Sequence, residues 1–143
     1  MTRTVLFGLG VVLALSVGGW VQGSDTAQVT VLTKSTSSWN GSELPHYPQG
    51  QPEITILRIT VPPKSRLPVH EHPVINAGVL LRGQLTVVTK NNEILHLKAG
   101  DPIVELVNKP HFGENEGDEP AEIIVFYAGI KDRPITTKVG GAH

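Results

Sequence analysis

Short runs of β-prone residues, separated by turn residues, constrain the fold of this chain most. After residue 27 no stretch repeats its apolar residues with the period of a helix. Runs rich in Val, Ile and Thr instead alternate with Gly, Pro and Asn turn signals. The predicted strands are 28–33, 53–61, 74–81, 85–89, 94–97, 103–107 and 122–127. Many short strands at such spacing predict an all-β sandwich or barrel.

Residues 1–23 have the layout of a secretory signal peptide. Arg3 precedes an apolar run over residues 5–17, and small and polar residues follow it. We expect cleavage after Gly23 and export of the mature chain to the periplasm or the outside of the cell. The alternative is an uncleaved membrane anchor, because residues 5–21 reach the shortest length that spans a bilayer.

The remaining chain is long enough for one domain. We divide it into an N-terminal strand and irregular arm over residues 24–52, a barrel over residues 53–130 and a C-terminal tail over residues 131–143. The formal net charge is −1 without a basic stripe, so we expect no nucleic-acid partner. The chain has no cysteine, so its chemistry must depend on His, carboxylates, amides or a bound ion.

The pair His70 and His72 is the first candidate for a site. Alternate side chains of a strand face the same way, so both imidazoles could reach a single ion. This spacing alone also fits two exposed histidines. Asn76 follows with the parity of His72, and a second block running from Gly100 leads to His111.

Both blocks resemble the conserved motifs of the cupin superfamily, G-x5-H-x-H-x(3,4)-E-x6-G and G-x5-P-x-G-x2-H-x3-N. HEHPVINAGVLLRG supplies His70, His72 and Gly83 at the family spacing, and GDPIVELVNKPHFGEN supplies Gly100, His111 and Asn115. The resemblance covers roughly residues 53–128. It implies a double-stranded β-helix (jelly-roll) cupin barrel and a metal site of three histidines and one glutamate.

The chain departs from the family pattern at the fourth ligand. The family's glutamate falls on Asn76, and the proline and glycine of the second motif fall on Leu106 and Asn108. Some cupins, such as thiol dioxygenases, hold iron with three histidines and no glutamate. We therefore predict that His70, His72 and His111 bind one divalent transition metal ion, with Fe, Zn, Ni, Cu and Mn not distinguished. The alternative is a set of barrel-lining polar residues without an ion.

Three further residues are candidates for the pocket. Asn76 could hydrogen-bond a substrate or water, or serve as a fourth ligand. We expect Glu105 to be solvated; facing inward, it could replace the lost carboxylate ligand or act as a general base. Arg58 shares a face with Ile54 and Ile56 and, if that face lines the barrel, could bind an anionic substrate.

The site allows three functions at this point. The first is a metal-dependent oxygenase, isomerase or decarboxylase that acts on a small organic molecule outside the cytoplasm. The second is a non-catalytic exported protein that binds a metal or small ligand, and the third is a barrel with a vestigial site. A homodimer would form if the predicted strand 28–33 paired with a neighbour's sheet edge.

Overall fold

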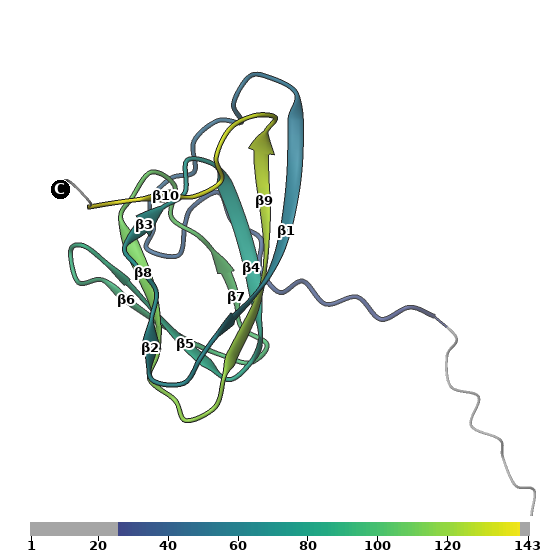
Figure 1. Cartoon of the computed structure of the whole chain (residues 1–143). Coiled ribbons are helices and arrows are strands. Elements are labelled where there is room, and N and C mark those ends of the chain that lie inside the picture. The colour runs from purple at the N-terminus through teal and green to yellow at the C-terminus, as the bar shows by residue number, and fades with distance from the viewer. Residues whose placement is uncertain (1–25, 141–143) are drawn as a thin grey trace, which may run out of the picture.

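A computed structural model describes residues 26–140 of the chain and shows an all-β domain without a helix in that range (Figure 1). Accordingly, no helix in these residues could cross a membrane. The strands are β1 (Pro52–Val61), β2 (Ser65–Arg66), β3 (His70–Glu71), β4 (Ile75–Arg82), β5 (Gln84–Thr89), β6 (Ile94–Lys98), β7 (Pro102–Val104), β8 (His111–Asn115), β9 (Ala121–Ile130) and β10 (Thr137–Lys138).

The strands form two sheets that face each other across the interior (Figure 1). One sheet has the order β1-β9-β4-β7, and the other has the order β10-β3-β8-β5-β6 with β2 added beside β8. The paired strands are antiparallel, and most sheet neighbours are not consecutive in the chain. This arrangement fits a jelly-roll barrel, in which the chain passes repeatedly between two sheets.

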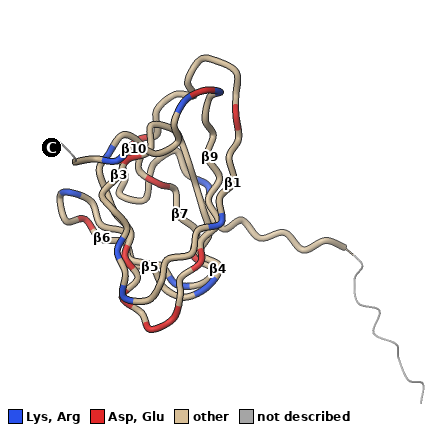
Figure 2. The backbone as a smooth tube through the Cα atoms, viewed as in Figure 1, with Lys and Arg blue, Asp and Glu red and all other residues tan. Residues whose placement is uncertain are grey.

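Alternation along the strands places the core between the sheets. In β9, Ala121, Ile123, Val125 and Tyr127 are buried, whereas the residues between them are more exposed. This period of two is the pattern of a strand with one face toward the core. Figure 2 shows basic and acidic residues interspersed around the barrel, with both signs at both ends.

Two glycines have structural roles at β4: Gly78 within the strand lets β9 approach closely, and Gly83 after the strand allows a turn. A Cβ on Gly78 would lie 2.6 Å from the carbonyl oxygen of Ile124 on β9, so a side chain does not fit there. Gly83 joins β4 to β5 with a φ of 75°, in the left-handed region that glycine adopts at low cost. A glycine therefore suits the backbone conformation of the turn between these two strands.

The chain outside the barrel differs from the sequence prediction at both ends. The predicted strand 28–33 pairs with no strand in the described chain, and Val29 is 86% exposed; that prediction is wrong for a single chain because β-propensity does not supply a partner. The predicted tail instead returns to the barrel, where β10 pairs with β3. The predicted signal segment 1–23 lies outside the described residues.

Candidate metal centre

Neighbouring elements of one sheet bring the three candidate histidines together. His70 in β3 lies directly opposite His111 in β8, and His72 follows just after β3, where it bridges to Val107. One ring nitrogen from each residue lies within 4.8 Å of those of the other two. We call His70, His72 and His111 the three-histidine group.

Each histidine in the group is held by a backbone carbonyl through Nδ1. The acceptors are Pro68 for His70 at 2.8 Å, Ile135 for His72 at 3.0 Å and Lys109 for His111 at 2.8 Å. A carbonyl only accepts hydrogen bonds, so Nδ1 carries the proton and the Nε2 lone pair is free in the neutral ring. This second contact fixes tautomer and orientation, as is usual for histidines that bind metals.

Burial keeps these imidazoles in the form that binds a metal. His72 and His111 are almost fully buried, and desolvation lowers the pKa of His72 to about 4. Desolvation also lowers the pKa values of His70 and His111 below the ordinary value. A neutral ring at physiological pH needs no deprotonation before it binds a cation.

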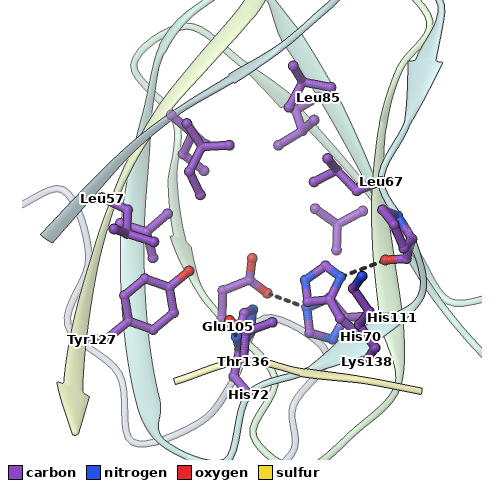
Figure 3. A pocket seen from close by; sticks show the side chains of 17 residues that line it. Leu57, Leu67, His70, His72, Leu85, Glu105, His111, Tyr127, Thr136 and Lys138 are labelled. Atoms are coloured by element: carbon purple, nitrogen blue, oxygen red, sulfur yellow. Dashed lines mark hydrogen bonds and ion pairs between the residues drawn. The ribbon is translucent and has the colours of Figure 1, made fainter. Parts of the chain in front are cut away.

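Glu105 is buried beside the three-histidine group, which corrects the prediction that it is solvated. It is only 8% exposed, and its Oε2 lies 3.6 Å from His111 Nε2 (Figure 3). Its side chain follows the parity of Ile103, which faces the interior from β7. Burial raises the pKa of Glu105 to about 7 and lowers the pKa of His111, so both shifts favour the neutral forms and oppose an ion pair in this contact.

The contact between Glu105 and His111 leaves two polar atoms unpaired. Glu105 Oε2 and His111 Nε2 are both buried and have no hydrogen-bond partner. An ionised carboxylate and an unprotonated Nε2 are both acceptors, and buried acceptors without partners are costly. A cation beside the three Nε2 atoms would satisfy both, so the residues present fit a metal ion.

The other two candidates lie elsewhere. Asn76 is buried on β4 and donates from Nδ2 to the carbonyl of Val74, but its side chain is not among those that line the cavity. Arg58 lies on the outer face of β1 and reaches Glu122 at 3.9 Å with a 66% exposed side chain. The face that Arg58 shares with Ile54 and Ile56 therefore does not line the barrel, because the alternate residues of β1, such as Ile59, line the cavity instead.

Asn76 and Glu105 are nonetheless neighbours across two strands. The backbone N–H of Glu105 donates to the carbonyl of Asn76 at 3.0 Å. The chain thus carries an amide where the family motif has glutamate, and a carboxyl group at an adjacent position just beyond β7. Within the described residues Glu105 is the one carboxyl group that lines the cavity.

A cavity of about 290 Å³ opens beside the three-histidine group. Three of its lining residues were missed from the sequence: Tyr127, Thr136 and Lys138. Tyr127 lies on β9, and burial raises its pKa to about 12. Thr136 lies 3.1 Å from His72 Nδ1 through its hydroxyl, and Lys138 lies opposite His70 in β10 (Figure 3). Tyr127 could have been predicted from the sequence, because it lies two residues from Val125 and therefore faces the same side of the strand.

Comparisons with known proteins agree with this architecture. The family model described as a cupin domain matches residues 57–127. No curated protein matches the sequence. Among solved structures, the DMSP lyase DddQ from Ruegeria pomeroyi superposes with a TM-score of 0.53 at 19% identity, covering 59% of this chain and 42% of that one.

Two further solved structures share the fold at similar distance. The formate complex of oxalate decarboxylase from Lactobacillus farciminis has a TM-score of 0.52 at 20% identity, covering 60% of this chain and 26% of that one. The polyketide cyclase RemF from Streptomyces resistomycificus has a TM-score of 0.53 at 18% identity, covering 62% of each chain. The aligned part is therefore less than two thirds of each of these proteins, and the likeness concerns the fold. The domain match, the in-register histidine motifs and the shared barrel show that this chain belongs to the cupin superfamily.

Proposed function

We propose that the barrel binds one divalent transition metal ion through Nε2 of His70, His72 and His111, and that this centre acts on a small organic molecule. The observation that carries the proposal is that the three rings converge while a backbone carbonyl holds Nδ1 of each. Each Nδ1–H is bonded to a carbonyl, which leaves Nε2 as the free ring nitrogen of each histidine, and one ring nitrogen of each lies within 4.8 Å of those of the other two. Three neutral nitrogen ligands leave coordination positions for a substrate, as catalytic metal sites require.

Glu105 supports an enzyme over a storage site. Its carboxyl group is buried in the cavity 3.6 Å from His111 Nε2, where it can give a proton to a bound substrate or take one from it, which suits a general acid or base. When bound, the metal would supply Lewis-acid or oxygen-activating chemistry. Glu105 would supply the proton, while the Tyr127 hydroxyl and Thr136 would line the substrate's polar end.

The class of reaction is proposed from relatives of the same fold. The similar structures are named as a lyase, a decarboxylase and a cyclase. We therefore propose a lyase, decarboxylase, isomerase or oxygenase reaction on a small organic molecule. The alternative is a non-catalytic protein that binds a metal or small ligand in the same cavity.

Metal content tests the proposal first. The mature protein is prepared in metal-replete medium, dialysed and measured by elemental analysis beside His72→Ala and the control His96→Ala. His96 lies on β6, where its Nδ1 pairs with Thr86 Oγ1 at 3.0 Å, outside the cavity lining. We expect about one ion per chain in the wild type and the control, and a large loss in His72→Ala. Absence of metal from the replete wild type would refute the proposal.

Glu105→Gln then separates an enzyme from a binding protein. Metal-loaded wild type is assayed against a panel of small carboxylic and hydroxylated substrates by oxygen uptake and product analysis. We expect Glu105→Gln to retain metal but to lose turnover, because an amide does not exchange a proton. Turnover that is unchanged in this variant would show that Glu105 is not the acid or base. No turnover with any substrate, together with tight ligand binding, would favour the non-catalytic alternative.

We also propose that residues 1–23 direct export of the mature chain. The support is the order of Arg3, the apolar run over residues 5–17 and the small residues up to Gly23. Mass spectrometry of the protein from a periplasmic extract tests this. A mature chain that begins at Ser24 is expected, and a full-length chain in the membrane fraction would favour the anchor.

For assembly, we propose a second copy of the chain as the partner. The outer face of β1 and β9 exposes Ile54, Ile56 and Phe126, with Ile56 and Phe126 paired in register. The segment 28–33 pairs with no strand among residues 26–140, and β1 is an edge strand. Light scattering should give a dimer that Ile56→Glu dissociates and the control Ile94→Glu, on β6, does not. A monomeric wild type would refute it.

A further inference from the structure

The cavity beside the three-histidine group has one polar end and one apolar end. Glu105, Thr136 and the histidines gather at one end in Figure 3, whereas Leu67 and Leu85 lie at the opposite end. Val87, Ile123 and Val125 line the same cavity and offer no polar side-chain atom. A ligand that fills this space must therefore carry its polar atoms at one end and an apolar body at the other.

Gly113 enlarges the apolar end of the cavity. It lies in the middle of β8 on the same face as His111, and it lines the cavity. A Cβ at this position would meet Leu67 and Leu85 side chains at 3.6 Å, which is ordinary contact. Gly78 differs, because a carbonyl at 2.6 Å from its Cβ position excludes any side chain. No neighbouring backbone atom therefore requires a glycine at position 113. A glycine inside a strand often marks a place where a ligand approaches the backbone closely.

The volume of the cavity limits the size of that ligand. An apolar cavity of about 150 Å³ holds benzene, which has six heavy atoms. The cavity here measures about 290 Å³, close to twice that volume. By proportion it admits about twelve heavy atoms, head group included.

The charged groups at the cavity favour an anionic head. Lys138 is the one Lys or Arg among the lining residues of the described chain. A divalent ion held by three neutral imidazoles keeps its positive charge, which an anionic oxygen would offset.

We propose that the site takes a monocarboxylate with an apolar body, about twelve heavy atoms in all. Its carboxylate binds at the three-histidine group near Lys138, and its body packs against Gly113, Leu67 and Leu85. This substrate class rests on the proposed function, since it places the head group at the metal centre.

Two acids that differ only in their apolar body test the substrate class. Calorimetry on the zinc-loaded protein compares 4-phenylbutanoate, which has twelve heavy atoms, with propanoate, which has the same head group. The amide of 4-phenylbutanoate tests the charge of the head. We expect the phenyl acid to bind at least about tenfold more tightly than either control.

Variants at Gly113 test where the body lies. Gly113→Val should abolish most of the preference for the phenyl acid while metal content and propanoate binding stay unchanged. Gly113→Ala, which introduces only ordinary contacts, should give an intermediate loss and guards against misfolding of the valine variant. Leu67→Ala should instead admit the larger 4-(naphthyl)butanoate.

Metal content, measured on the same samples, distinguishes the two proposals. A protein that holds zinc but binds both acids equally refutes the substrate class alone. The substrate class is also refuted if both Gly113 variants keep the full preference for 4-phenylbutanoate over propanoate. A protein that holds no zinc refutes the proposed function and this inference with it.

Discussion

The raised pKa of Glu105 makes the stability of the metal-free protein depend on pH. Burial raises this pKa from 4.5 to about 7, so the folded state holds the proton to higher pH than the unfolded state. The contribution of protonated Glu105 to the free energy of unfolding is fully present below about pH 4.5 and is lost as the pH rises through about 7. A difference of about 2.5 pH units corresponds to about 3 kcal/mol, and Glu105→Gln should lack this dependence.

Urea unfolding of wild type and Glu105→Gln in the presence of a chelator measures the effect. Only the difference between the two proteins is used, so that the histidine titrations common to both largely cancel. We expect Glu105→Gln to gain roughly 2–3 kcal/mol relative to wild type between about pH 5 and about pH 8.5. The control Glu53→Gln, at an exposed position of β1, should show no such trend.

Zinc should reverse the order of the two proteins at high pH. A cation beside Glu105 favours the ionised carboxylate, so zinc should stabilise the wild type more than Glu105→Gln. A difference between the metal-free proteins that stays constant across this pH range would refute the assignment of Glu105 as a buried, proton-holding carboxyl group.

Three further measurements test the histidine group and its support. Because burial lowers the pKa of all three histidines, metal affinity should be lost at a pH below the ordinary imidazole pKa of about 6.5, and calorimetry that finds its loss centred near pH 6.5 would contradict this. Asn115→Ala should destabilise the barrel by about 2–3 kcal/mol in urea melts, because its side chain bonds Val61 and Gly117 in the interior, and metal content should not change. Thr136→Val should weaken zinc binding several-fold, up to about tenfold, because it removes one of two partners of His72 Nδ1; unchanged affinity would contradict a role for Thr136.

The parts of the fold that depend on local pattern follow from the sequence. The strand parity that placed His70 and His72 on one face is a property of a few consecutive residues. The family spacing from Gly100 to His111 then linked two blocks that β3 and β8 bring into register. These features explain why the three-histidine group could be identified without coordinates.

The features that depend on pairing between distant strands could not be predicted in this way. Glu105 belongs to a run with two alternating faces, and its burial is decided by the pairing of β7 with β4, at Ala77 and Val104. The sequence of β1 likewise does not say which of its two faces lines the barrel, and the structure shows Arg58 on the outer face. The two-residue strand β10 is too short to show a period, so nothing in the sequence predicted that Lys138 in β10 and Thr136 just before it would line the cavity.

The central claim is that one metal ion is held by the Nε2 atoms of His70, His72 and His111. X-ray absorption at the edge of the bound metal tests it most directly, because imidazole rings give a characteristic outer-shell signal. For zinc we predict three imidazole nitrogens at about 2.0–2.1 Å, with oxygen in the remaining positions. A zinc-loaded protein whose spectrum shows oxygen ligands alone, or one imidazole that His96→Ala removes, would contradict the claim.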